Sequence, residues 1–197
     1  MASFLVLYGT GEGQTETVAT HVRDELIGRG HEATTVDASE ISPEFAIDDF
    51  DAIIVGASIH VGKHQPSVRA FVTTNRDTLA TKPTAFFQVS MASADEGGEA
   101  KAAGYVEEFV DATGWHPDRI GLFGGALRYS KYGFVKRLVM KRIARRTVTE
   151  MPKPNPSGDV EFTDWDDVEA FAADVAAFVE GRLGITPPTA EDHVELE

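Results

Sequence analysis

Apolar runs and helical patterns alternate along the chain. Continuous apolar stretches predict strands at 3–8, 51–56, 84–90 and 119–125, because strands buried on both faces read as unbroken hydrophobic runs. A more polar stretch, 31–37, predicts another strand with greater exposure. Strands that alternate with helices favour a parallel sheet covered on both faces, so the expected fold class is α/β with a five-stranded parallel sheet.

Helices are expected between the strands, where apolar residues recur at helical spacing. Gly30 and Gly114 stand where glycines commonly end helices. Thr163 or Asp164 is a suitable N-cap for the last helix. The expected helices begin at about residues 14, 66, 100, 133 and 165.

A glycine-rich turn, Tyr8–Thr15, joins the first strand to the first helix. Gly11 and Gly13 allow the positive φ angles and the close ligand approach that such a turn needs. Thr10 and Thr15 add hydroxyl donors, and the first helical turn directs free N–H groups and the positive end of its dipole to the same point. This combination predicts an anion site, and phosphate is the obvious anion.

The spacing of this turn excludes two common nucleotide motifs. A triphosphate loop needs a lysine after its last glycine, but the first lysine of the chain is Lys63. A dinucleotide loop needs G-x-G-x-x-G, whereas the glycines here are Gly9, Gly11 and Gly13. Amides and hydroxyl groups without a cation suit the phosphate monoester of flavin mononucleotide (FMN). The alternative is an ordinary strand-to-helix turn whose glycines serve geometry alone.

Two further loops follow strands and are rich in small residues. They are expected at 56–64 and 91–98, close to the first loop, because ligands of doubly wound sheets bind beyond the carboxyl ends of the strands. Small residues let the backbone approach a flat ring system. The three loops together therefore favour a flavin, with His60, His64 and Met91 as the larger side chains available to it.

Composition narrows the classes of function. The length of 197 residues suits one domain, expected over 1–183, with an acidic, proline-containing tail at 184–197 that we expect to be disordered. The chain has no cysteine, which excludes disulfides, thiolate metal sites and cysteine nucleophiles. The six histidines show no HExxH-type spacing, so no metal site is assigned. Without a basic leader or an apolar run of roughly 20 residues, a cytoplasmic location is expected.

Charge is unevenly distributed. The net charge of −14 disfavours nucleic acid as a partner. Yet eight of the 18 lysine and arginine residues fall within 128–146, where there is no acid and where apolar residues recur at helical spacing. Three interpretations of this basic segment stay open. It packs on the core of an acidic protein, it touches an anionic membrane surface or a quinone, or it attracts a substrate that bears carboxylates.

Four motifs together resemble the flavodoxin family. They are Glu12–Thr15, Gly56–Ile59, Gly125–Tyr129 with Tyr132, and Phe162–Trp165. The first is shared by many flavodoxins. The third is more specific to one branch, the flavodoxin-like, menaquinone-dependent protoporphyrinogen oxidases. This resemblance implies a flavodoxin-like fold, bound FMN, and dehydrogenation of protoporphyrinogen IX with electrons passed to a quinone in haem biosynthesis.

The resemblance also implies which residues form the site. The cofactor-binding residues would be Thr10, Gly11, Glu12, Gly13, Gln14 and Thr15 at the phosphate, and Ala57, Ser58, Ile59, His60, Val61, Gly62, Lys63, Ser90, Met91, Ala92 and Ser93 beside the flavin ring. Contact with substrate or membrane would come from Arg128, Tyr129, Lys131, Lys136 and Arg137. No catalytic residue is assigned, because a flavin brings its own redox chemistry.

Other classes of function stay open beside the enzyme. A soluble electron carrier of the flavodoxin type would share the fold and the cofactor, but it would have no need of the basic segment 128–146. A scaffold that has lost its flavin is a third interpretation. A hydrolase is disfavoured, because Gly56–His60 shares only part of the nucleophile-elbow pattern and lacks its final glycine.

Overall fold

The computed structural model describes residues 1–42, 45–94, 98–127 and 160–185. Three expectations lie outside these residues: the basic helix at 133–146, the contact residues from Arg128 to Arg137, and the tail beyond 185. They stay predictions, as does the domain boundary at 183. Within the described part of the chain, no helix is both long enough and apolar enough to cross a membrane.

Five parallel strands form the central sheet, in the order β2-β1-β3-β5-β6. Flavodoxin is itself a standard example of this doubly wound order, so the expected flavodoxin-like α/β fold is confirmed. The short β4 pairs antiparallel with β3, and β7 pairs with β8 in a separate ribbon. The strands are β1 (Ser3–Gly9), β2 (Glu32–Asp37), β3 (Ala52–His60), β4 (Lys63–His64), β5 (Thr84–Ser90), β6 (Arg119–Gly124), β7 (Ala126–Leu127) and β8 (Val160–Glu161).

Burial of the strands follows their place in the sheet. Every residue of β5 is buried, and so are Phe4 to Leu7 in β1, because helices cover both faces of these central strands. The outer strand β2 has no buried residue. This contrast explains why unbroken apolar runs marked the inner strands while β2 reads as polar.

The helices begin and end where their caps predict. Pro66 opens α2 at its first turn, the Asp164 side chain accepts a hydrogen bond from the Asp166 N–H (3.1 Å) at the start of α6, and Gly114 ends α4 with a φ of 66°. The helices are α1 (Gln14–Gly28), α2 (Pro66–Thr74), α3 (Arg76–Leu79), α4 (Glu99–Thr113) and α6 (Trp165–Leu183), with short 3₁₀ turns at Ile47–Asp49 and Ala92–Ala94.

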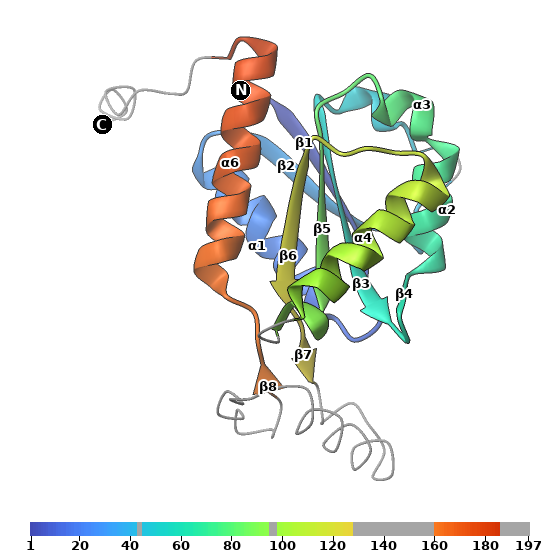
Figure 1. The fold of residues 1–197 in the computed structure, drawn as a ribbon. Coiled ribbons are helices and arrows are strands. Elements are labelled where there is room, and N and C mark those ends of the chain that lie inside the picture. The colour runs from blue at the N-terminus through green and yellow to red at the C-terminus, as the bar shows by residue number, and fades with distance from the viewer. Residues whose placement is uncertain (43–44, 95–97, 128–159, 186–197) are drawn as a thin grey trace.

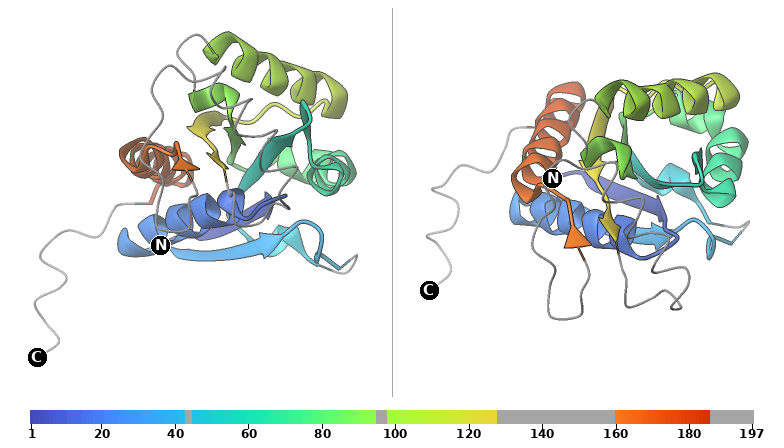
Figure 2. Two further views of the ribbon diagram at one scale, coloured as in Figure 1. Left: turned by 90° about the horizontal axis from the view of Figure 1, so that it is seen from below. Right: turned by 60° about the horizontal axis from the view of Figure 1, so that its bottom comes forward.

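Two hydrophobic cores lie on the two faces of the sheet (Figures 1 and 2). On one face α1 and α6 pack side by side, with Val22 and Val175 in the core beneath them. On the other face α2 and α4 bury Val68 and Phe109. The carboxyl ends of the strands point to the lower edge of Figure 1, where α6 also begins.

The strand β3 is longer than the sequence predicted. The expected strand ended at Gly56 and was followed by a loop to His64, and this prediction is wrong. Instead β3 continues to His60, and a tight turn at Val61 and Gly62 leads into β4. The φ angles of these turn residues, 51° and 77°, are the positive values that a two-residue hairpin requires.

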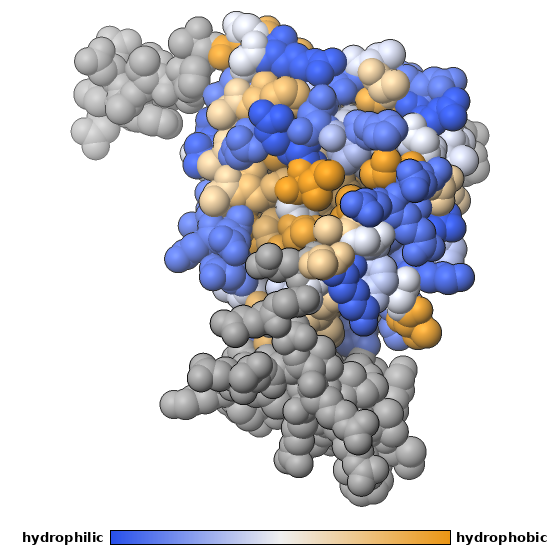
Figure 3. Space-filling view, in the orientation of Figure 1, coloured by the Kyte–Doolittle hydropathy of each residue, from blue (hydrophilic) through white to orange (hydrophobic). Residues whose placement is uncertain are grey.

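The strand β6 forms one edge of the sheet and exposes apolar side chains. Ile120 is 50% exposed and Leu122 is 36% exposed. Figure 3 shows apolar surface in the middle of this face, where β6 lies between α6 and α4 in Figure 1. This edge lies apart from the carboxyl ends of β1 and β3.

Gly56 provides a test of the packing between β3 and β5. It pairs with the fully buried Phe87, and a methyl group at Gly56 would overlap the Phe87 ring. We expect Gly56→Ala to lower the free energy of unfolding by about 1–3 kcal/mol in urea titrations.

Gly104→Ala is the matched control, because a Cβ there meets no atom within 4 Å and Gly104 lies exposed within α4. It should be neutral, or stabilising by up to about 1 kcal/mol. Wild-type stability in Gly56→Ala would contradict the packing described.

Candidate functional site

Three strand ends meet where the strand order reverses. β1 lies between β2 and β3, so the chain leaves β1 toward one side of the sheet and returns on the other. Gly9 pairs with Ala57, and Ser58 pairs with Val89, so the segments after β1, β3 and β5 start side by side. Doubly wound sheets bind their ligands at this reversal point.

The loop after β1 is shaped by its glycines. Gly13 has a φ of 94° directly before α1, a left-handed backbone that favours glycine. The Gly13 N–H donates a 2.8 Å hydrogen bond to Thr10 Oγ1, which closes the loop on itself. A Cβ at Gly9 would overlap Val68, so a glycine is needed for β1 to end against α2.

Thr15 has a buried hydroxyl group in the first turn of α1. The residue is fully buried, and its Oγ1 has no hydrogen-bond partner among the residues that the structure describes. The N-cap residue, Gly13, has no side chain to meet the first N–H groups of the helix. A buried donor left unpaired costs about 1–3 kcal/mol. An anion with several oxygens would satisfy these donors together.

Gln65 is a residue of this edge that the sequence analysis missed. Its Nε2 donates to Ser58 Oγ at the end of β3, and it would lie 3.8 Å from a Cβ at Gly11. Its Oε1 is buried and has no partner in the described part of the chain. The carboxamide therefore joins the first loop to the end of β3. Its place directly before Pro66, which opens a helix, was the available sequence signal.

Gln14 ties the first loop to a distant segment. Its Nε2 donates to Glu161 Oε1 and to Thr163 Oγ1, both at 2.8 Å. Thr163 Oγ1 in turn donates to the Gly124 carbonyl oxygen at 2.8 Å. The Gln14 side chain thus anchors the start of α1 to β8 and to the end of β6.

The hairpin after β3 presents polar and exposed groups. Ser58 and Ile59 are half-buried at the end of the strand, while His60 and Lys63 are exposed. Val61 at the tip is 88% exposed. The hairpin therefore offers its backbone and edge, rather than a packed side chain, to a ligand.

The segment after β5 forms a fixed turn. Ser90 is buried, and Met91, Ala92 and Ser93 are half-buried. Ser90 Oγ and Ser93 Oγ are 2.8 Å apart, and the Ser93 N–H donates to Ser90 Oγ at 3.1 Å. The Gly125 N–H donates to the Ser90 carbonyl oxygen at 3.1 Å, which ties this turn to the end of β6.

Comparison with known protein families decides the membership of the chain. A family model described as a flavodoxin domain matches residues 5–152. The chain belongs to the flavodoxin family. The match begins two residues after the start of β1. It covers the rest of β1, the loop after it and the other four strands of the central sheet.

Two relatives of this flavodoxin domain have the same name in distant organisms. The chain is 30% identical to the protoporphyrinogen IX dehydrogenase (quinone) of Escherichia coli strain K12 over 174 residues, which cover 87% of this chain and 93% of that protein. It is 28% identical to the protoporphyrinogen IX dehydrogenase (quinone) of Leishmania major over 192 residues, which cover 97% of this chain and 80% of that protein.

Solved flavodoxin structures share the fold. A short-chain flavodoxin associated with a bacterial microcompartment superposes with a TM-score of 0.55 at 17% identity, over 91% of this chain and 99% of that one. A flavodoxin mutant from Pseudomonas aeruginosa gives a TM-score of 0.51 at 19% identity, over 91% and 99%. At these identities the likeness shows the fold alone.

The side chains of two residues expected near the flavin of this flavodoxin domain point into the core, and only the backbone of Ala57 remains a predicted flavin contact. Ala57 is fully buried in β3 and belongs to the core beneath α2 and α4. His64, in β4, is 6% exposed and packs against the rings of Phe86 and Phe109, with centroids 5.6 and 4.7 Å away. The expectation that His64 faces a ligand is therefore wrong.

His64 is a neutral core residue. Its Nε2 lies 2.9 Å from Gln88 Oε1, while Gln88 Nε2 donates to the Ala102 carbonyl oxygen. The amide oxygen of Gln88 therefore accepts from His64. Burial lowers the pKa of His64 to about 4, because the charged imidazolium would lose its hydration there.

Carboxylates gather on the β2 side of the first loop. Burial raises the pKa of the Tyr8 phenol, and Glu16, Asp37 and Glu40 raise it further. The phenol also hydrogen-bonds with Glu16 in the first turn of α1. Tyr8 therefore stays protonated, and negative charge lies on this side of the loop.

The buried His64 makes stability depend on pH. An unfolded chain binds a proton at His64 near pH 6.5, but the folded protein binds it only near pH 4. The contribution is complete above pH 6.5 and is lost as the pH falls toward 4. We expect the free energy of unfolding to drop by about 1 kcal/mol more in the wild type than in His64→Gln between pH 7 and about 5.5.

His116→Gln is the control, because His116 is exposed. It should follow the wild-type pH dependence in the same urea titrations. A parallel profile for His64→Gln and the wild type would show that His64 titrates normally in the folded protein.

Proposed function

We propose that this protein is an FMN-dependent protoporphyrinogen IX dehydrogenase that passes electrons to a quinone. The observation that carries the proposal is the 30% identity to the Escherichia coli enzyme of that name, over 93% of its length. The Leishmania major relative adds an independent match over 97% of this chain. The reaction would remove six electrons and six protons from the porphyrinogen and reduce three quinones to quinols.

The residues at the carboxyl edge fit the cofactor. The phosphate of FMN would bind the amides of the first turn of α1 and the Thr15 hydroxyl. The Thr15 hydroxyl has no partner among the described residues. The ring would lie against the hairpin at His60–Lys63 and the turn at Ser90–Ser93. When bound, the flavin would supply the electron transfer itself, and the protein would supply position and electrostatics.

A basic segment outside the described residues is the candidate contact site for the quinone acceptor. The segment 128–146, including Arg128, Lys136 and Arg137, has no acid, whereas the chain as a whole has a net charge of −14. Such a segment is attracted to anionic membrane surfaces, at about 1 kcal/mol for each lysine or arginine near the surface. We therefore propose that this segment contacts a membrane-borne quinone. The protein would then be associated peripherally with the membrane.

Thr15 provides a test of the cofactor site. We expect Thr15→Val to weaken FMN binding by about tenfold or more, because a hydrogen bond to a charged group contributes about 1.5–3 kcal/mol. The apoprotein should be as stable as the wild type or more stable, since the variant removes a buried hydroxyl group without a partner in the described structure. Quenching of FMN fluorescence measures the affinity, and urea titration measures the stability.

Thr73→Val is the matched control for Thr15→Val. Thr73 lies in α2, and its hydroxyl donates to the Arg69 carbonyl oxygen within the same helix. It should leave FMN affinity unchanged. If Thr15→Val bound FMN as tightly as the wild type, the Thr15 hydroxyl would not be part of the phosphate site.

The activity is tested with the flavin-loaded protein under anaerobic conditions. We expect protoporphyrin fluorescence to appear only when both protoporphyrinogen IX and a menaquinone analogue are present. With the quinone held in anionic vesicles, the double variant Lys136→Gln, Arg137→Gln should keep its flavin but react roughly tenfold more slowly. Absence of porphyrin formation, together with rapid electron transfer from the chemically reduced flavin to a protein acceptor, would instead identify a soluble carrier.

A further inference from the structure

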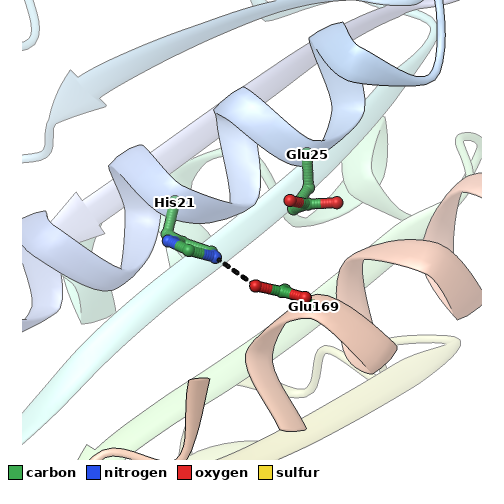
Figure 4. Close-up of side chains that lie close together, drawn as sticks. All are labelled: His21, Glu25 and Glu169. Atoms are coloured by element: carbon green, nitrogen blue, oxygen red, sulfur yellow. Dashed lines mark hydrogen bonds and ion pairs between the residues drawn. The ribbon is translucent and has the colours of Figure 1, made fainter. Parts of the chain in front are cut away.

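Three side chains that can bind a metal meet between α1 and α6, two to three helical turns after the start of α1. His21 and Glu25 are one turn apart on α1, and Glu169 lies on α6. Figure 4 shows all three pointing into the space between the two helices. The imidazole nitrogen and the two carboxylate oxygens lie within 4.8 Å of one another. None of these residues belongs to the flavin site proposed at the carboxyl edge of the sheet.

The spacing of these groups is close to that of a zinc site. Zinc binds nitrogen and oxygen ligands at about 2.0–2.2 Å, so neighbouring ligand atoms of a tetrahedral site lie about 3.3 Å apart. His21 Nε2 and Glu169 Oε1 are already 3.2 Å apart. A Glu25 carboxylate oxygen lies within 4.8 Å of a ligand atom of each of these two residues. One imidazole with two carboxylates favours a transition metal over Mg²⁺ or Ca²⁺, which prefer oxygen ligands throughout.

The charges at this place are incomplete without a cation. His21 pairs with Glu169, but the half-buried Glu25 carboxylate has no hydrogen-bond or ion-pair partner in the portion of the chain that the structure describes. Even a protonated His21 would leave one of the two carboxylates uncompensated. A divalent ion would neutralise both carboxylates and would bind neutral His21 at the same time.

We propose that His21, Glu25 and Glu169 bind a divalent transition-metal ion, with Zn²⁺ preferred, that links α1 to α6. The helices already pack against each other, and Gln14 and Thr163 join their first turns. The metal adds a second link about two to three turns further along α1. Its effect is to stabilise the face of the sheet that supports the anion loop, whether or not flavin is bound.

Trp165 allows the site to be tested directly. Its ring lies 4.9 Å from the His21 ring, whereas the other tryptophan, Trp115, is buried in the core on the opposite face of the sheet. Ni²⁺ quenches nearby indole fluorescence and accepts the same ligands as Zn²⁺. Adding Ni²⁺ to the full-length flavin-loaded protein should therefore quench fluorescence saturably, Zn²⁺ should reverse the quenching, and Trp165→Phe should abolish it.

The ligands are tested by conservative variants. We expect His21→Gln and Glu169→Gln each to weaken Ni²⁺ and Zn²⁺ binding by roughly tenfold or more, and Glu25→Gln to weaken it as well. His116→Gln, which changes an exposed histidine elsewhere, should bind both metals as the wild type does. Thermal unfolding with EDTA checks that each variant is folded, and Zn²⁺ should raise the midpoint in the wild type but not in His21→Gln.

Two results would overturn the proposal. One is the absence of saturable quenching at millimolar Ni²⁺, which would leave His21 and Glu169 as an ion pair only. The other is equal metal affinity in the wild type, His21→Gln and Glu169→Gln, which would place the metal elsewhere on the chain. Both results are independent of porphyrinogen oxidation, because no substrate is present.

Discussion

The buried Thr15 hydroxyl, which has no partner in the described structure, is the constraint on which the carboxyl edge of this protein depends. Gly13 takes a left-handed backbone at the N-cap, so no side chain meets the first N–H groups, and the Thr15 hydroxyl is buried in the same turn without a partner in the described structure. Contacts from distant segments hold this arrangement in place. Gln14 is tied to Thr163, and Gly9 ends β1 against α2. An anion rich in oxygen completes what these contacts leave open.

Residues of β3 contribute both to the core beneath α2 and α4 and to the carboxyl edge of the sheet. Beneath α2 and α4, Ala57 and His64 fill the core, and the Phe86 and Phe109 rings leave His64 no contact with solvent or ligand. Side chains alternate between faces along a strand, so Ser58, next to Ala57, instead reaches Gln65 at the carboxyl edge. Adjacent residues of the long β3 therefore have different environments. Ala57 packs in the core, and Ser58 lies at the carboxyl edge. This is why its hairpin offers backbone and exposed groups to a ligand.

Carboxylates lie near the loop of residues 10–13, which has no cationic side chain. The loop of residues 10–13 has neutral donors, while Glu16, Asp37 and Glu40 surround Tyr8 on one side of it. On the face of α1 and α6 the Glu169 carboxylate pairs with the His21 imidazole, and the Glu25 carboxylate lies nearby. The proposed phosphate of FMN would be held in this acidic protein by amide dipoles at short range, where a helix terminus acts most strongly, instead of by net charge.

The order of elements and the glycine turn before α1 followed from the sequence alone, because strand burial, helix caps and glycine turns depend on neighbours within a few residues. Apolar runs marked four of the five parallel strands and a more polar stretch marked β2, while Pro66, Gly114 and Asp164 marked helix ends. Contacts between distant segments required the tertiary structure. His64 looked like a ligand-facing residue until Gln88 and two phenylalanine rings were brought around it. The pairing of His21 with Glu169, 148 residues apart, arises only because α1 and α6 lie side by side, and no local pattern encodes that packing.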